Sequence, residues 1–296
     1  MDFCETLRSL NIEFTQNEPL SEHTTFKIGG PCDYFVKPTD LDGVIATINA
    51  AKECAVPYFI LGNGSNLLVS DLGIEGAVIS LAEFSGITAD GNTLSVLSGT
   101  RLSALCSFAL EQSLGGMQYF WGIPGTVGGA VYMNAGAYGG EIKDILISVT
   151  ALVDGEIKRF SADECELSYR DSIFKKNGGI ILSADFGLRP MQKEQIRAEM
   201  DTLIARRKDK QPLEYPSAGS VFKRPKDNFA GTLIEECGLK GYSVGGAMVS
   251  PKHAGFIVNT GGATASDVRR LIEYVKETVF MQKSINLESE IIFVGR

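Results

Sequence analysis

Apolar residues recur along the chain with two spacings, one typical of strands and one typical of helices. Short apolar runs predict strands at residues 33–36, 58–61, 77–81, 93–96, 180–186 and 291–294. A helical repeat predicts helices at residues 41–53, 102–112, 192–208 and 267–278. Two further runs, 147–153 and 156–160, predict a hairpin that turns at Asp154-Gly155. The pattern therefore predicts a fold that mixes strands and helices throughout.

Capping residues set the expected ends of two helices. Gly115-Gly116 is expected to close the helix at 102–112, because glycine favours the left-handed turn after a helix. Ser266 or Asp267 is expected to start the later helix as its N-cap. Both choices rest on local chemistry alone.

Changes in composition and in the predicted elements along the chain indicate its domain organisation. Residues 1–20 predict a short helix and a linker. The expected boundary near Pro190 then separates a larger part, residues 21–190, from a smaller α/β unit, residues 191–296.

Charge and hydropathy narrow the class of protein. The chain has 296 residues and a formal net charge of −8, which argues against a nucleic-acid scaffold because neutralising phosphates needs clustered Lys and Arg. Its start lacks the character of a signal peptide, and no apolar run approaches the ~20 residues that span a bilayer. We therefore expect a cytoplasmic protein without nucleic-acid or membrane partners.

Cysteine and histidine usage bears on redox state and metals. The six cysteines are scattered without a CxxC pair, which indicates reduced, mostly buried thiols. The only histidines in the sequence are His23 and His253, too few and too far apart for the spacing of a structural zinc site. We expect no metal.

Two glycine-rich stretches are the strongest chemical signal. The stretch 115–140 holds nine of the 33 glycines, and a second stretch at 61–67 reads LGNGSNL between apolar runs. Each glycine in a regular element costs roughly 0.5–1 kcal/mol relative to Ala, so this density indicates tight turns or a ligand against the backbone. Two such stretches in one half of the chain favour a large, phosphate-bearing cofactor.

The first stretch offers an anion nest. Gly62 and Gly64 permit consecutive amides to point one way, and Ser65 and Asn66 add side-chain donors. The pattern matches neither GxGxxG nor a P-loop, so a Rossmann site is not supported. A tight turn between strands is the alternative interpretation.

The second stretch combines a turn with a helix start. Pro124-Gly125 predicts the turn, and residues 126–134 predict a helix whose free N–H groups face an anion. Asn134 and the small residues 135–137 suit contact with a planar ring. A closely packed glycine helix in the core is the alternative.

Several polar residues stand in turn-like or apolar surroundings. Arg170 can bind a carboxylate as a fork or form an ion pair with the adjacent Asp171. Ser220, after a flexible glycine, can act as proton donor, nucleophile or turn hydroxyl, but it lies outside a GxSxG motif. Glu288 and Glu290 are expected on one face of a strand, by default an exposed edge.

Seven segments, in order, resemble one family of flavoenzymes. They are HTTFKIGGPCDYFV (23–36), LGNGSNLLVSD (61–71), GIPGTVGGAVYMNAGAYGGEI (122–142), YRDSIFK (169–175), PSAGSVFKRP (216–225), AGTLIEECGLKGYSVGGAMVSPKHAGFIVN (230–259) and LESEIIFVG (287–295). Together they resemble the UDP-N-acetylenolpyruvoylglucosamine reductases of early peptidoglycan precursor synthesis, in their shorter type without an inserted tyrosine loop.

The resemblance implies an α+β fold, with a two-subdomain FAD-binding fold of the vanillyl-alcohol-oxidase type in residues 21–190 and a substrate-binding domain in 191–296. FAD would be bound non-covalently. Its pyrophosphate would lie over Gly62, Asn63, Gly64, Ser65 and Asn66. Its ring would lie near Gly122, Ile123, Pro124, Gly125, Thr126, Gly129, Asn134, Gly136 and Ala137.

The resemblance also implies the reaction. NADPH would reduce the flavin, which would pass hydride to UDP-N-acetylglucosamine enolpyruvate. Ser220 matches the serine that donates the proton, and Arg170 and Glu290 match the residues that stabilise the enol-like intermediate. Three cations are expected at the substrate, Lys210, Lys223 and Arg224. The enzyme is expected to be a monomer.

Overall fold

The computed structural model describes residues 2–296 and divides the chain into two compact units. The first consists of Met1–Phe14, Val36–Asn63 and Val78–Arg207, and the second of Thr15–Phe35, Gly64–Ala77 and Lys208–Arg296. This division differs from the expected one, because the first unit continues past Pro190 and two N-terminal segments group with the C-terminal part.

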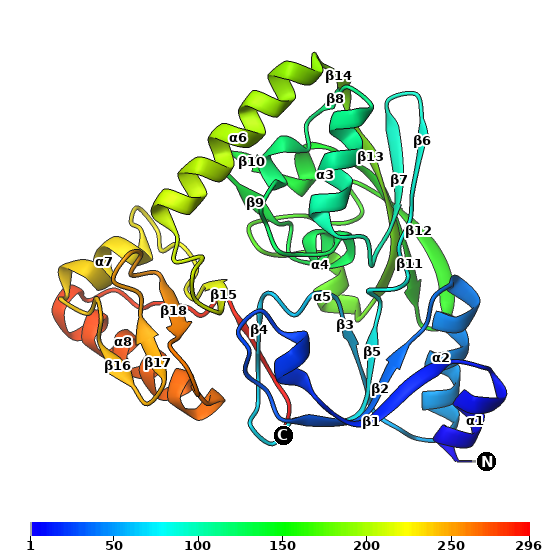
Figure 1. Cartoon of the computed structure of the whole chain (residues 1–296), viewed down its shortest axis with the longest axis horizontal. Helices are drawn as coiled ribbons and strands as arrows, with labels where there is room; N and C mark the ends of the chain where they lie inside the picture. Colours follow the sequence, from blue (N-terminus) through cyan, green and yellow to red (C-terminus); the bar gives the residue numbers. More distant parts are fainter. Residues whose placement is uncertain (1) are drawn as a thin grey trace. The chain divides into compact units, whose positions relative to one another are not determined.

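An antiparallel sheet of five strands forms the centre of the first unit (Figure 1). In order its strands are β12 (Glu156–Ser161), β11 (Leu146–Val153), β13 (Ile180–Gly187), β7 (Thr93–Leu97) and β6 (Ile87–Asp90). The expected hairpin joins β11 to β12, and positive φ at both Asp154 and Gly155 gives the mirror-image turn that suits strand twist.

Helices cover the core of this unit. They are α1 (Phe3–Ser9), α2 (Leu41–Glu53), α3 (Leu102–Glu111), α4 (Val127–Tyr132), α5 (Ile173–Asn177) and α6 (Lys193–Lys210), with short 3-10 turns η2 (Gln118–Phe120) and η3 (Ile142–Asp144). The main core joins apolar residues of α3 and α4 to β7, β11 and β13. Two small ladders pair β9 (Gly136–Ala137) with β10 (Gly140–Glu141) and β8 (Leu114–Gly115) with β14 (Arg189–Pro190).

A further sheet has the strand order β1 (Glu13–Pro19), β2 (Pro31–Lys37), β5 (Ile74–Ser80) and β3 (Tyr58–Leu61). The first three of these strands run through the points where the chain passes from one unit to the other. The linker expected before Pro19 is therefore wrong, because its residues form β1. The polar run of β1 hides it from a search for apolar periodicity.

The second unit has a sheet of its own with the order β15 (Ser217–Ser220), β18 (Phe256–Asn259), β17 (Ala247–Val249) and β16 (Ser243–Val244). A parallel pair joins β19 (Ile292–Val294) to β4 (Leu67–Val69). Helices α7 (Ala230–Glu236) and α8 (Ala265–Lys283) and the 3-10 turn η1 (Leu20–His23) complete it. Its core consists mainly of apolar residues from α7, α8, β17 and β18.

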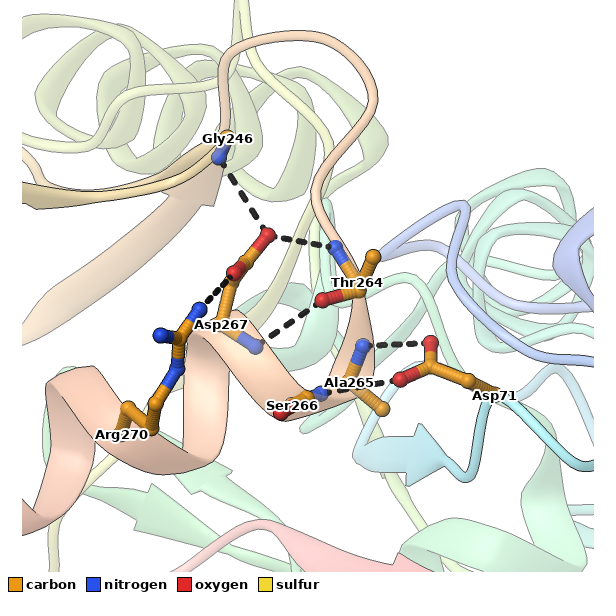
Figure 2. Close-up of polar contacts among 7 residues, drawn as sticks. All are labelled: Asp71, Gly246, Thr264, Ala265, Ser266, Asp267 and Arg270. Carbon is orange, nitrogen blue, oxygen red and sulfur yellow. Dashed lines mark hydrogen bonds and ion pairs between the residues drawn. The ribbon is translucent and has the colours of Figure 1, made fainter.

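The N-terminus of α8 is capped twice, as Figure 2 shows. Thr264, not Ser266 or Asp267, is the N-cap, and its hydroxyl accepts the Asp267 N–H at 3.0 Å while Asp267 accepts the Thr264 N–H at 3.1 Å. The Asp71 carboxylate accepts the N–H groups of Ala265 and Ser266 at 2.7 and 3.0 Å. Asp71 thereby attaches the segment after the first glycine-rich loop to the start of α8.

Replacing Asp71 by alanine is expected to lower the free energy of unfolding by about 1–2 kcal/mol, the usual effect of losing a helix cap. The variant leaves two first-turn amides without their carboxylate acceptor. Urea unfolding of the purified protein measures the change. Ser266→Ala is the matched control, because it keeps the backbone N–H, and an equal loss in both variants would contradict the assignment.

His253 connects stability to pH. Its Nδ1 accepts the Gly255 N–H at 3.1 Å, and its ring packs closely on Gly231. Burial lowers the pKa of His253, and Lys240 adds to that effect while Glu235 opposes it. The unfolded chain therefore binds a proton more readily than the folded one in the window just below a pH of about 6.5, and stability decreases as pH falls through it.

We expect the wild-type protein to lose more unfolding free energy than His253→Gln between pH 7.5 and pH 5.5. The comparison cancels the other titrating groups, because both proteins carry them. Parallel urea titrations at the two pH values measure the difference, and identical losses would exclude His253 as a contributor.

Several other expectations can be compared with the structure. Helix α2 has the predicted bounds, but α3 ends at Glu111 with Gln112 as its C-cap and Ser113 in the left-handed region, while Gly115 enters β8. Glu288 and Glu290 precede β19 and do not share a strand face. The six cysteines are free thiols, and burial raises the pKa of Cys106 to about 12.

Two features of residues 2–296 concern membrane crossing and metal binding. None of the helices in this described part has the length and apolar character that a bilayer crossing requires. Within the same residues, no group of three or more His, Cys, Asp or Glu side chains is arranged to hold a metal ion.

Candidate active site

The two glycine-rich stretches meet within the first unit. The Asn63 side-chain amide donates to the Pro124 carbonyl at 2.8 Å. A Cβ on Gly62 would lie 2.6 Å from the Thr126 hydroxyl oxygen, so only glycine fits there without a shift. The sequence predicted both stretches, and the tertiary structure places Gly62 and Asn63 against the turn before α4.

The start of α4 differs from the expected anion site. The amides of Val127 and Gly128 donate to the carbonyls of Thr100 and Ser98 at 2.9 and 2.8 Å, and the Gly129 amide donates to the Thr126 hydroxyl at 3.4 Å. The prediction of free N–H groups at this helix start is therefore wrong for these three amides. The alternative, a closely packed glycine helix, describes the segment better, because α4 packs on β13 and β7.

The rest of the first loop belongs to the second unit and has the geometry of an anion nest. Gly64 has φ +58°, and a Cβ there would lie 2.3 Å from the His23 carbonyl oxygen. Within residues 2–296, the amides of Gly64 and Ser65 donate no hydrogen bond. Two adjacent donors on a left-handed turn fit a phosphate oxygen.

Asn134 is used differently from the expectation. It is fully buried with φ +40°. Its side-chain amide donates to Glu141 and to the Ser168 carbonyl at 3.0 and 2.9 Å, and its oxygen accepts the Lys143 N–H at 3.0 Å. Both hydrogens of its side-chain amide are used in these bonds, so the Asn134 side chain has no donor left for a cofactor.

Arg170 lies next to the second glycine-rich stretch. Its guanidinium donates to the Gly136 carbonyl at 3.3 Å, and its backbone takes the left-handed conformation in a tight turn between Ser168 and Asp171. The pKa of Glu141 is lowered, chiefly by its hydrogen bond with Lys143 and also by the Arg170 charge. The structure thus brings Arg170 to the loop predicted to face the ring.

Ser220 and Glu290 are neighbours in the second unit. Ser220 ends β15, where it pairs with Phe256, and the Glu290 N–H donates to the Val221 carbonyl at 2.7 Å. The side chain of Asn66 donates to the Glu290 carbonyl at 3.3 Å. These bonds hold the Glu290 backbone against Val221, the residue after Ser220, and against the Asn66 side chain at the end of the first glycine-rich loop.

The three cations expected at the substrate have protein contacts of their own. The Lys223 ammonium lies 3.2 Å from a Glu288 oxygen, and the Lys210 ammonium lies 3.3 Å from Asp209 and is three-quarters exposed. The Arg224 guanidinium stacks over the exposed Phe229 ring at 4.1 Å. Exposed pairs of this kind are weak and exchange readily with a ligand.

Glu141 was not predicted as a site residue, whereas Arg207, with Arg206 and Lys210, forms a basic cluster that could meet a diphosphate or equally well belong to the basic end of a helix. No local pattern marks Glu141, because its partners Asn134, Lys143 and Arg170 meet it only after folding. Arg207 lies against Gly122, where a Cβ would be 3.4 Å from its Cδ.

FAD is the group that the glycine-rich stretches would hold, and the residues present fit it. The amides of Gly64 and Ser65 supply unpartnered donors for a diphosphate, and Gly62 and Gly64 leave no room for a Cβ.

Comparisons with known proteins show the family to which the chain belongs. Residues 32–161 match the family model of an FAD binding domain, and residues 211–294 match that of the UDP-N-acetylenolpyruvoylglucosamine reductase C-terminal domain. The chain is 51% identical over 294 residues to the UDP-N-acetylenolpyruvoylglucosamine reductase of Agathobacter rectalis. The matched region covers 95% of this chain and 93% of that protein.

Solved structures give the same result. The crystal structure of the UDP-N-acetylenolpyruvylglucosamine reductase of Thermus caldophilus has a TM-score of 0.81 and 37% identity, over 95% of this chain and 98% of that one. A variant of berberine bridge enzyme, at TM-score 0.52 and 17% identity, covers 65% of this chain and 44% of its own and shares the fold alone. The expected two-domain FAD-binding α+β fold is confirmed, and the chain belongs to the UDP-N-acetylenolpyruvoylglucosamine reductase family of FAD-containing oxidoreductases.

Proposed function

We propose that the protein reduces UDP-N-acetylglucosamine enolpyruvate to UDP-N-acetylmuramate with NADPH, a step of peptidoglycan precursor synthesis. One observation carries the proposal. The backbone bond between Glu290 and Val221 and the side-chain bond from Asn66 link Glu290 to the residue after Ser220 and to the end of the first glycine-rich loop.

Bound FAD supplies the hydride in this reaction. The substrate double bond gains hydride at the carbon distal to the ether and a proton at the carbon next to the carboxylate. It becomes a single bond, and NADPH, as the source of the two electrons and the hydride, would become NADP⁺.

Three residues share the work on the substrate. Hydride addition moves negative charge onto the substrate carboxylate and the carbon beside it, and the Arg170 fork stabilises that charge. Glu290, as a carboxylic acid, donates a hydrogen bond to the same group. Ser220 delivers the proton, a task for which a hydroxyl needs such support because it is a poor acid in water.

The roles of the two parts of the chain follow from this assignment. We infer that FAD is held chiefly by residues within 21–190, and that 191–296 binds the substrate and supplies Ser220 and Glu290. Arg170 belongs to the first unit, whereas Gly64–Asn66, Ser220 and Glu290 belong to the second.

A flavin oxidase of the same fold is the competing function. The presence of Arg170, Ser220 and Glu290 together favours the reductase, because an oxidase does not need a proton donor and a carboxylate fork for an enolpyruvyl group.

Anaerobic stopped-flow on the flavin-loaded protein separates the two. The expected result is bleaching of the flavin near its ~450 nm band by NADPH, and rapid recovery when the enolpyruvyl ether is added. Recovery with oxygen alone would support the oxidase, and failure of the purified protein to bind FAD would overturn both.

A further inference from the structure

Arg207 is a partly buried cation that has no partner within residues 2–296, and its Nε is the buried part of the guanidinium. In the same residues the guanidinium has no hydrogen bond and no ion pair. A charge taken out of water is costly unless it is paired, so an unpaired guanidinium points to an anion that binds there.

Two contacts of α6 with the 116–122 segment fix the position of Arg207. Gly122 has φ +89°, and a Cβ on it would lie 2.7 Å from the tip of Ile204 and 3.4 Å from the Arg207 side chain. Farther along α6, Glu199 accepts the buried Gln118 amide at 2.8 Å. Helix α6 is therefore held along the 116–122 segment, and its last turns present Arg207 to the glycine-rich stretch.

A second cation and a tyrosine lie near Arg207. The neighbouring Arg206 lies over the Tyr138 ring at 5.1 Å. Burial lowers the pKa of Arg207, whereas Tyr138 acts in the opposite direction. A guanidinium stays protonated in proteins, so the charge remains.

We propose that Arg207 binds an anionic oxygen of the bound flavin nucleotide and is a cofactor-binding residue of this enzyme. The inference rests on the proposed function, because that function places FAD along Gly122–Ala137. The shared chemistry is a guanidinium fork on an anionic oxygen. Two parts of FAD offer such an oxygen, the pyrophosphate in both redox states and the ring once it is reduced.

The test compares Arg207→Met, which keeps the apolar stem and removes the charge, with Arg207→Lys, which keeps the charge. Arg206→Met is the matched control, being the adjacent arginine on the same helix. For each protein, the FAD dissociation constant is measured by fluorescence quenching on the apoprotein, and the flavin midpoint potential is measured after reconstitution. Circular dichroism checks the fold of each apoprotein.

We expect Arg207→Met to weaken FAD binding at least tenfold, or to weaken binding of reduced flavin at least tenfold more than that of oxidised flavin. The second outcome corresponds to a midpoint potential about 30 mV lower for a two-electron couple. Arg206→Met should stay within threefold of wild type, and Arg207→Lys should recover part of the loss, because it keeps the charge and loses the planar fork. If Arg207→Met binds both FAD and the competitor ADP more weakly, the contact of Arg207 is with the pyrophosphate. If its midpoint potential falls while ADP binding is unchanged, the contact is with the flavin ring.

Unchanged FAD affinity and unchanged potential in Arg207→Met would overturn the inference. If that variant does not fold, Arg207→Gln is measured in its place under the same criteria. If the wild-type protein binds FAD and the variants have the same FAD affinity and potential, only the role of Arg207 is rejected. If the wild-type protein does not bind FAD, the proposed function is rejected.

Discussion

Replacing Ser220 by alanine is expected to slow reoxidation of the flavin by the enolpyruvyl substrate about 10²- to 10⁴-fold, the usual contribution of a positioned acid. Reduction of the flavin by NADPH should stay nearly unchanged, because that step needs no proton at the substrate carbon. The variant keeps the backbone pairing of Ser220 with Phe256, so the strand is preserved. Anaerobic stopped-flow of each half-reaction measures the two rates separately.

Ser217→Ala is the control for this prediction. Ser217 lies on the same strand, pairs with Val258 in the same sheet, and differs only in being outside the proposed chemistry. An equal fall of both half-reactions in Ser220→Ala would show that the hydroxyl supports the site as a whole and does not donate the proton.

Replacing Arg170 by methionine is expected to slow the second half-reaction by about 10²–10³, the effect of removing one group that stabilises developing charge. Lysine at this position should restore part of the rate, because it keeps the charge and loses the planar fork. Both substitutions keep the strain of the left-handed backbone at Arg170, so their comparison isolates the head group. Single-turnover rates over a range of substrate concentration separate binding from chemistry.

Arg159→Met is the matched control, because Arg159 is an exposed arginine paired with Asp185 on the five-stranded sheet. The hydrogen bond from Arg170 to the Gly136 carbonyl suggests the competing result. If Arg170→Met weakened FAD binding and slowed both half-reactions alike, Arg170 would serve to hold the hairpin of β9 and β10, and its assignment to the substrate would be wrong.

Local sequence signals predicted an element correctly where its capping or turn residues belong to that element. Helix α2 begins after the Asp40 cap and has its predicted bounds, and the hairpin at Asp154-Gly155 turns where the residues with positive φ stand. The same signals failed for β1 and for the sheet of β15–β18, whose short or polar strands acquire order from their neighbours. Strand formation there is a property of the pairing, not of the single segment.

By itself the sequence determined the two glycine-rich stretches, the family resemblance and the residue types of the site. Only the tertiary structure decided what those residues do. It used both side-chain donors of Asn134 inside the protein and paired the amides at the start of α4, and within residues 2–296 it gave the Arg207 guanidinium no hydrogen-bond partner. Hydrogen-bond satisfaction and burial depend on groups far apart in the chain, so they are fixed only when the chain is folded.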